Sequence, residues 1–407
     1  MHKMFLVIFF VSLIGALIAP IFSISKLFLF LPFLFWKNKR LFFTVFLFLV
    51  INFYGGINIS GDFEFVGKVI QTSDSYSLVF GKVYYNGKWI FPRMLVGVNE
   101  EIPLGDIVYY YGEINYEKFS YPKVKLEKNR VIVSPYFSVF RTIYLTSENF
   151  RKKLLNYNEI YYGLFGGKVK DKYLKESGLY HFFSISGLHI SIIYVFLVLL
   201  FSSFSFQKYI ALIFSFLFVV ATGLNLPTIR AFLLLFFSNV LENKKYSKVD
   251  ILCLIGIVFL FLEPSLAFSL SFYMSFFSTL GILLVENKFL KSVSAFLGSA
   301  PFLALFSSVN IFSILGTFLL VIPFQILLVV VFVSFFLDLL CLTTFSEFLL
   351  TLFNPLTIFV ENVAIFFSKM PKIPGGIFAY FFLELFFFVF LLHFGHIPYI
   401  LKSKSSN

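Results

Sequence analysis

The chain has 407 residues, of which 59% are apolar and only 13% are charged. This composition excludes soluble globular, fibrous, disordered and secreted disulfide-rich proteins. It predicts a polytopic α-helical membrane protein, because the core of a bilayer needs about 20 apolar residues for each helical span. The formal net charge is +12, and most of the excess lies in short loops and at span ends, where positive charge sets orientation.

Two apolar runs precede the first polar region, and we interpret residues 1–59 as N-terminal transmembrane segments. The run from Met4 to Trp36 predicts two spans, or one span and a short re-entrant piece. The basic cluster Lys37, Lys39 and Arg40 marks the cytoplasmic side. The run from Leu41 to about Ile57 therefore carries the chain outward.

Residues 60–135 change from continuous to alternating hydrophobicity, which is typical of β-strands. Turn signals occur at Asn86-Gly87 and Gly105-Asp106. Five short strands suit a small OB-like barrel, and the preceding span places this all-β domain outside the cytoplasm. The predicted strands are residues 63–71, 76–85, 88–98, 106–114 and 124–133.

The segment 136–180 is polar and Lys-rich with interspersed apolar residues, which predicts an amphipathic interfacial segment broken at Gly166-Gly167. Residues 181–401 follow as a multi-helix transmembrane domain, and 402–407 form a tail. About nine apolar stretches are expected there, at 181–203, 207–224, 228–241, 249–262, 268–285, 293–308, 311–337, 348–368 and 376–400.

Polar residues inside apolar stretches are expensive, so they mark the first functional candidates. On one helix, His181, Ser184, Ser186 and His189 would share a broad face, with Gly187 allowing a neighbouring backbone to come close. This stripe either lines a polar path or forms hydrogen bonds between packed helices.

A second group contains Thr222, Gly223, Asn225, Pro227 and Arg230. Gly, Asn and Pro break a helix, and unwound backbone at membrane depth is tolerated only where protein or water satisfies it. Arg230 would then pair with a phosphate or carboxylate in a cavity. The alternative is an ordinary loop between spans, with Arg230 as an interfacial anchor.

Single polar residues add two weaker candidates. Ser271 lies near the start of an apolar stretch. Asp338 lies in a long apolar stretch, where it either faces a water-filled interior or marks a helix end.

Enzymatic functions find little support in the residues. Ser184-Ile185-Ser186-Gly187 is superficially similar to the nucleophile segment of rhomboid proteases, but Ser184 replaces the expected Gly and no partner His lies in another span. No HExxH motif, paired Cys/His cluster or Walker A loop occurs. We therefore expect no enzyme, no metal and no cofactor, and any transport would be driven by a partner or a gradient.

Three blocks of sequence resemble the ComEC/Rec2 competence family. The family signature Gly-Leu-x-His-Leu-Leu-Ala-Ile-Ser-Gly-Leu-His-Val is matched from Gly178 to Ile190, with the Gly, both His and the Ile-Ser-Gly-Leu core retained. The segment from Thr222 to Ala231 is similar to its Thr-Gly and Pro-x-x-Arg-Ala block, and Asp250 to Phe272 is similar to the next. A Gln of the family is Ser269 here, and an Asn is Phe318.

The resemblance implies a cytoplasmic-membrane channel that carries single-stranded DNA inward during natural transformation. Many relatives have a C-terminal metallo-β-lactamase-like domain, so a chain ending at Asn407 is expected to have no nuclease of its own. The implied partners are single-stranded DNA, membrane lipids, an external DNA receptor, a cytoplasmic helicase and single-strand-binding proteins. The alternative function is a transporter or enzyme for a lipid-linked or peptide substrate.

A strand carries one negative charge per nucleotide, so cations, hydroxyls and helix dipoles along its path would stabilise it. In the barrel domain, aromatic and basic residues could form a groove in which bases stack, although alternation predicts that about half of the aromatic side chains face the core. The residues proposed for this groove are Lys82, Tyr84, Tyr85, Lys88, Trp89 and Arg93, with Tyr109 and Tyr111 beside them.

Overall fold

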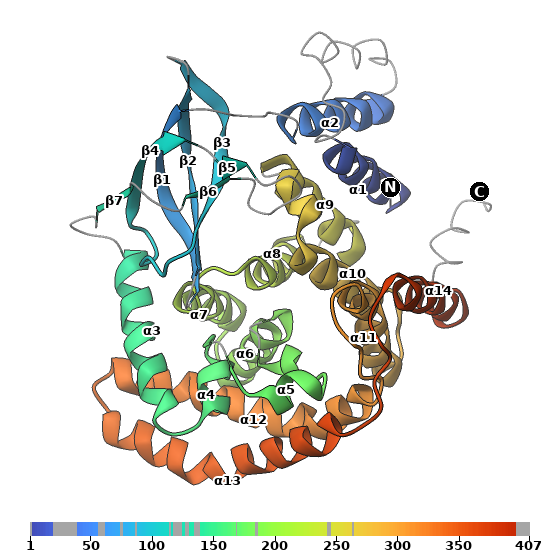
Figure 1. Cartoon of the computed structure of the whole chain (residues 1–407). Coiled ribbons are helices and arrows are strands. Elements are labelled where there is room, and N and C mark those ends of the chain that lie inside the picture. The colour runs from blue at the N-terminus through green and yellow to red at the C-terminus, as the bar shows by residue number, and fades with distance from the viewer. Residues whose placement is uncertain are drawn as a thin grey trace. The chain divides into compact units, whose positions relative to one another are not determined.

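A computed structural model of the chain is mostly helical and contains one small curled sheet (Figure 1). Contacts divide it into two compact units. The first comprises residues 1–138, 240–276 and 396–407, and the second comprises 139–239 and 277–395. The described residues are 2–18, 39–55, 62–73, 76–85, 88–113, 115–116, 124–126, 130–133, 139–167, 169–183, 186–241, 246–262 and 264–395.

Each apolar stretch predicted after residue 180 overlaps one α-helix of the described chain. These helices are α6 (Gly187–Leu200), α7 (Gln207–Ala221), α8 (Leu226–Val240), α9 (Lys248–Leu262), α10 (Leu270–Leu284), α11 (Lys288–Ala304), α12 (Ser313–Leu339), α13 (Thr343–Ser368) and α14 (Ile377–Phe394). By length and composition, three helices of the described residues could cross a membrane, namely α12, α13 and α14. The others have at most 17 residues.

In the first unit, α1 (His2–Ile18) packs against both α2 (Lys39–Gly55) and α9. The buried Asn52 side chain donates a hydrogen bond to the Gly15 carbonyl oxygen at 3.0 Å, which satisfies a polar group between the two apolar helices. Phe9 is fully buried and stacks on Phe276 with the ring centroids 4.2 Å apart. The second span or re-entrant piece predicted before Trp36 lies outside the described residues.

Within the described residues, the sheet has seven strands in the order β5-β6-β3-β2-β1-β4-β7. The first four predicted strands are confirmed as β1 (Asp62–Ser73), β2 (Tyr76–Tyr85), β3 (Lys88–Val98) and β4 (Ile107–Glu113). The remaining strands are the short β5 (Asn115–Tyr116), β6 (Val124–Leu126) and β7 (Arg130–Val133). All pairs are antiparallel except β3 with β6.

The predicted fifth strand, 124–133, is not one strand. Its first part, β6, pairs with β3 at one side of the sheet, and its second part, β7, pairs with β4 at the other side. The two parts of this ten-residue segment therefore pair near opposite sides of the sheet. Because so short a segment connects the two sides, the sheet must curl. Gly81 lies opposite Gly67, and a Cβ on Gly81 would be 2.2 Å from the Val66 carbonyl oxygen, so the strongly bent β1–β2 ladder requires glycine there.

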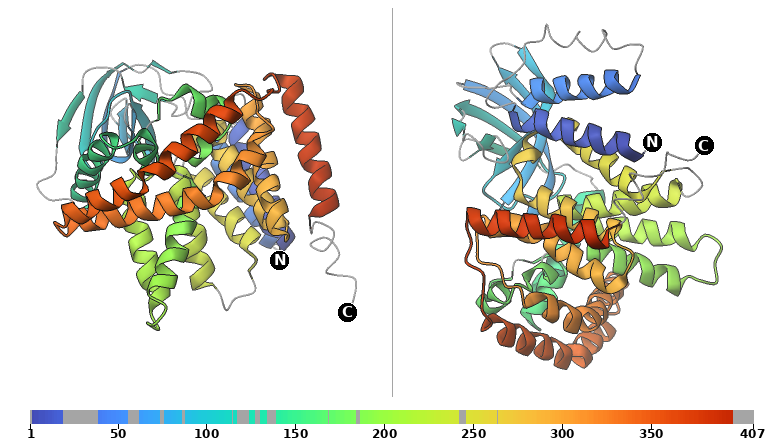
Figure 2. Two further views of the ribbon diagram at one scale, coloured as in Figure 1. Left: turned by 90° about the horizontal axis from the view of Figure 1, so that it is seen from below. Right: turned by 90° about the vertical axis from the view of Figure 1, so that its right-hand side faces the viewer.

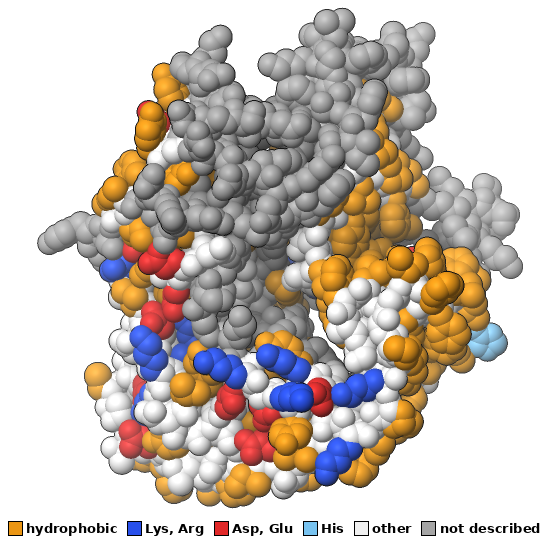
Figure 3. All heavy atoms as spheres, in the orientation of Figure 1, with side chains coloured by type: hydrophobic (Ala, Val, Ile, Leu, Met, Phe, Trp, Pro, Cys, Tyr) orange, Lys and Arg blue, Asp and Glu red, His pale blue; other side chains and the backbone are white. Residues whose placement is uncertain are grey.

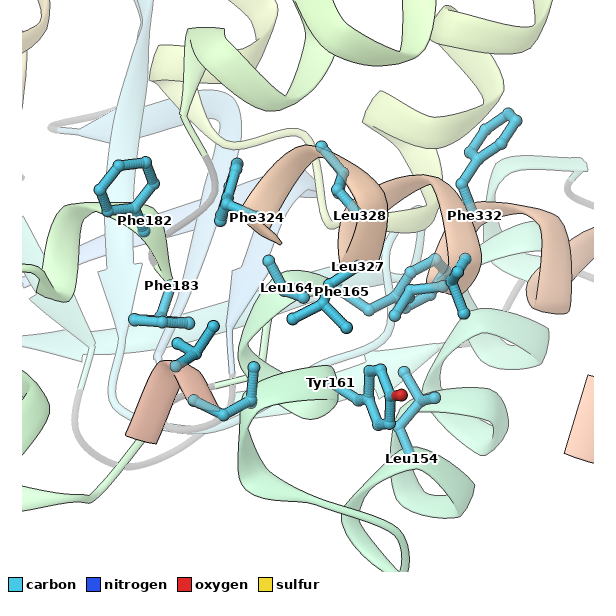
Figure 4. Packing of buried hydrophobic residues seen from close by; sticks show 14 of the residues in the cluster. Leu154, Tyr161, Leu164, Phe165, Phe182, Phe183, Phe324, Leu327, Leu328 and Phe332 are labelled. Atoms are coloured by element: carbon cyan, nitrogen blue, oxygen red, sulfur yellow. The ribbon is translucent and has the colours of Figure 1, made fainter. Parts of the chain in front are cut away.

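The second unit has a continuous apolar core between α12–α13 and the segment that leads into α6 (Figure 4). That segment contains α3 (Val139–Leu155), α4 (Glu159–Leu164) and α5 (Lys172–Glu176), with Gly166 at φ +98° after α4, where the sequence predicts a break. Labelled members of the core are Leu154, Tyr161, Leu164, Phe165, Phe182, Phe183, Phe324, Leu327, Leu328 and Phe332.

Within this unit, the long helices do not all run in one direction. α12 and α13 lie across α6, α7 and α14 in both Figure 1 and Figure 2. Of the three helices that are long enough to span, α14 alone follows the direction of the short α6 and α7. The hairpin of α12 and α13 instead covers the flank of the core formed by α3 to α5.

The exposed face of α3 to α5 carries a band of mixed charge (Figure 3). Ion pairs tie this band to the α12–α13 hairpin, since Lys153 Nζ lies 3.1 Å from Asp338 Oδ1 and 3.3 Å from Glu347 Oε1. Beyond α13, Lys372 Nζ lies 3.5 Å from Glu176 Oε2. The segment is therefore amphipathic, with an apolar side in the core and a charged side outside.

Candidate functional site

The N-terminus of α6 is built by the Ser-Gly-Leu-His sequence. Ser186 has extended backbone and caps the helix, with its side chain accepting a hydrogen bond from the Leu188 amide at 3.3 Å. The His189 side chain completes a capping box, because its Nδ1 accepts the Ser186 amide N–H at 3.2 Å. Since Nδ1 is an acceptor, the proton of the neutral imidazole is on Nε2.

The predicted one-face stripe from position 181 to 189 is wrong, because these residues do not form one helix. His181 belongs to a separate 3₁₀ helix, Tyr180–Phe182, and α6 begins only at Gly187. Ser184 and the side chain of His181 lie outside the described residues. His189 is fully buried and packs edge-on against Phe324 of α12, with the ring centroids 5.1 Å apart.

A tight turn joins α7 to α8 at the second predicted group. Thr222 is the C-cap of α7, Gly223 follows at φ +88°, and Leu224 is also left-handed at φ +54°. The Leu224 amide donates to the Val219 carbonyl and the Gly223 amide to the Val220 carbonyl, which is a Schellman closure. The interruption of the helix predicted at these residues is thus confirmed.

The same turn starts α8 with matching local chemistry. Asn225 Nδ2 donates to the Thr222 carbonyl at 3.0 Å, and the Asn225 carbonyl accepts from the amides of Thr228 and Ile229. Pro227 lies in the first turn of α8, where its missing N–H would have no helical partner anyway. The residues of this block therefore fix where one helix ends and the next begins.

Arg230 is buried in the second unit, with 6% of its surface exposed. Its Nη2 donates to Thr279 Oγ1 of α10 at 3.1 Å, and its Nε has no hydrogen-bond partner. Among the described residues it makes no ion pair. A buried guanidinium without a carboxylate is costly, so this position is suited to an anion.

The first two blocks meet in space. A Cβ built on Gly187 would be only 3.1 Å from the Ala231 Cβ, so the N-terminus of α6 lies against α8 at the residue that follows Arg230 in sequence. The positive end of the α6 dipole and a guanidinium are thus carried by adjacent elements. Phosphate oxygens are the usual ligands of such an arrangement.

Two other residues, Ser271 and Asp338, were also predicted to line the path. Ser271 is exposed in the part of α10 that belongs to the first unit. Asp338 lies at the end of α12, where both of its oxygens accept from Lys153 Nζ at 3.1 Å. The structure thus places Asp338 at a helix end, which was one of its two interpretations.

The outer face of the curled sheet carries part of the predicted groove. In the register of the strands, Tyr111 and Tyr84 flank Glu64, while Tyr109 and Lys82 flank Val66. Tyr109, Tyr111 and Lys82 are exposed, whereas Tyr110 packs on the core. The side chains of the other predicted groove residues lie outside the described part, namely Tyr85, Lys88, Trp89 and Arg93.

Sequence reasoning missed Arg151. It lies in α3, within the segment predicted to be polar, Lys-rich and amphipathic, yet only 3% of its surface is exposed. Its spacing from Tyr144 and Ser147, seven and four residues earlier, is the signal that could have assigned it to the buried face. In the described part of the chain, no group of three or more His, Cys, Asp or Glu side chains could hold a metal ion.

Comparison with known proteins gives three results. A protein of Aquifex aeolicus (strain VF5) described as uncharacterized is 30% identical over 229 residues, which cover 48% of this chain and 54% of that protein. The chain thus spans about half the length of this relative. No solved structure matches. The family described as "Competence protein" matches residues 169–395, which include both the α6 N-terminus and Arg230. More than half of the chain lies in this match, and the chain therefore belongs to the competence protein family.

Proposed function

We propose that this protein is a multi-pass channel of the cytoplasmic membrane that carries single-stranded DNA inward during natural transformation. Membership of the competence protein family supports a role in DNA uptake. The observation that carries the proposal is the buried Arg230, without an ion-pair partner among the described residues, on the helix that packs against the N-terminus of α6. Successive phosphates would pass these two groups, because both of them favour anions.

The sheet domain fits the same function as an OB-like barrel outside the membrane. Its support is the pairing of segment 124–133 with both flanks of the sheet, including a parallel pair with β3. Exposed Tyr109, Tyr111 and Lys82 would offer stacking surfaces and a cation to an arriving strand. An external receptor would deliver the DNA, and a cytoplasmic helicase with single-strand-binding proteins would draw the strand inward.

A proteolytic role has weaker geometric support. Ser186 Oγ lies 3.3 Å from His189 Nδ1, a distance compatible with a nucleophile and its base. However, the same Nδ1 also accepts the Ser186 amide N–H, and Ser186 Oγ accepts the Leu188 amide. Both groups are thus used to begin a helix, and we propose that the protein translocates without catalysing a reaction.

The test is uptake of fluorescent duplex DNA by a transformable bacterium whose own competence channel gene is deleted. Cells are complemented with wild type, Arg230→Gln or Lys208→Gln, and external and cytoplasmic signals are scored separately. Lys208 is exposed at the start of α7, so its substitution removes one charge away from the α6–α8 contact. Epitope-tagged protein levels show whether each variant accumulates.

Wild type and Lys208→Gln should restore the cytoplasmic signal, whereas Arg230→Gln should leave DNA outside the inner membrane. We expect a loss of tenfold or more in cytoplasmic DNA. This corresponds to losing roughly 1.4 kcal/mol or more of interaction between Arg230 and the strand, since that free energy equals a factor of ten. No cytoplasmic signal in cells that accumulate the wild-type chain would overturn the channel proposal. An envelope defect with unchanged uptake would favour a lipid-linked or peptide substrate instead.

A further inference from the structure

The second unit contains another buried arginine besides Arg230. Arg151 in α3 has 3% of its surface exposed, and neither its Nε nor its Nη2 has a hydrogen-bond partner among the described residues. It also forms no ion pair within the described part of the chain. Its neighbours in sequence differ, because Lys152 and Lys153 both pair with carboxylates.

The contacts of α3 show where this guanidinium lies. Ser147 Oγ lies 2.6 Å from the carbonyl oxygen of Ala221, the last residue of α7. Arg151 follows one helical turn later on the same face, and its Cζ lies 5.0 Å from the ring centroid of Tyr144, two turns back. The side chain therefore folds back past Ser147, which places the guanidinium against the C-terminal end of α7.

The groups present do not balance the cost of burying this cation. Removing an ion from water is costly even after relaxation. A cation–π contact and the negative end of the α7 dipole each return only part of that cost. An anion hydrogen-bonded to the buried Nε and Nη2 groups would supply the missing stabilisation, and the planar guanidinium fork matches phosphate geometry.

The position of Arg151 relative to the α7–α8 turn suggests which anion binds. Ala221 immediately precedes the turn 222–225, and Arg230 lies in α8 just after it. One buried arginine thus lies on the helix that contacts the residue before this turn, and the other lies on the helix that follows the turn. A polyanion that passes Arg230 would meet a second cation at Arg151. A single free anion, by contrast, would need only one of the two arginines.

We propose that Arg151 binds a phosphodiester group of the translocating strand at the C-terminal end of α7. This inference rests on the proposed function and adds a second phosphate position to it. The contact is independent of base identity, since Nε and Nη2 face phosphate oxygens. Arg151 is therefore a binding residue rather than a helix-packing residue.

The experiment uses the full chain in nanodiscs of phosphatidylcholine and a fluorescein-labelled oligo-dT. Anisotropy is measured over a series of KCl concentrations for wild type, Arg151→Gln, Arg151→Lys and Lys152→Gln. Lys152 is the matched control, because it has the same charge one residue further along and its side chain is 71% exposed. Size-exclusion profiles and circular dichroism show whether each variant folds.

Arg151→Gln should weaken oligo-dT binding about tenfold and reduce the slope of log K against log salt by about 0.7, the value for one single-strand phosphate contact. Lys152→Gln should keep the wild-type slope. Arg151→Lys should keep the slope and weaken affinity severalfold, because lysine lacks the bidentate fork. This last variant decides the question if Arg151→Gln does not fold.

Equal slopes and affinities in wild type and Arg151→Gln, or in wild type and Arg151→Lys, would overturn the site while leaving the channel function intact. No binding of oligo-dT by wild type would overturn the function and, with it, the strand as ligand. A second set of nanodiscs containing phosphatidylglycerol separates the sources of phosphate. Thermal stabilisation by this lipid that is lost in Arg151→Gln would assign Arg151 to a lipid headgroup and overturn the proposal.

Discussion

The capping box of α6 predicts that Ser186 and His189 act first on stability. Ser186→Ala removes the N-cap side chain, which typically costs about 1 kcal/mol, or roughly a fivefold change in the unfolding equilibrium. His189→Ala removes both the acceptor of the Ser186 amide and a fully buried ring packed on Phe324, for about 3 kcal/mol in total. Unfolding by sodium dodecyl sulfate, followed by circular dichroism, measures both losses.

The control is Ser186→Asn, because asparagine caps helices as well as serine does. It should retain wild-type stability and DNA uptake, while Ser186→Ala should lose uptake only as far as it loses folded protein. The double variant should lose less than the sum of the single losses, because one capping box is shared. If Ser186→Ala and Ser186→Asn both abolish uptake at unchanged stability, the hydroxyl acts on the substrate and the capping argument is refuted.

Three further substitutions test local features. Cys341 lies at φ +61° after α12, so Cys341→Gly should stabilise the protein by about 1 kcal/mol in the same unfolding assay, and a loss of stability would contradict this. Burial raises the pKa of Tyr161, whose hydroxyl donates to the Leu350 carbonyl at 2.9 Å. Wild type should therefore lose stability as pH rises above 10.0, the ordinary value, and Tyr161→Phe should lose less; parallel pH curves would contradict this. Gly81→Ala should cost about 2 kcal/mol or more, because its Cβ would meet the Val66 carbonyl oxygen, and should speed proteolysis of the sheet domain; unchanged cleavage would contradict this.

Hydrophobic pattern was sufficient to locate the helices and the first four strands, because period and length are local properties. Hydrophobic pattern did not locate the start of α6. A capping box normally uses Glu or Gln three residues after the cap, and His189 takes that place here. Segment 124–133 alternates like one strand, but its two parts have different partners, which alternation does not encode.

The candidate site was predictable only in part, for a similar reason. Gly, Asn and Pro in the sequence predicted the α7–α8 turn. Arg230 was identified as a candidate because it is a lone arginine in an apolar run. Arg151 stands among lysines, so its burial depends on α7 passing the same face of α3. Likewise, Lys153 and Asp338 are 185 positions apart, and no short-range signal joins them.

The shortness of α6, α7 and α8 has a consequence for the surrounding lipid. With 14 or 15 residues, each is only about 21 to 23 Å long, whereas the hydrocarbon core measures about 30 Å. Bilayers thin around helices that are too short for them. In the proposed channel, this thinning would shorten the low-dielectric interval that each phosphate must cross. The protein would thus lower the barrier to a polyanion by deforming the membrane, as well as by placing cations along the route.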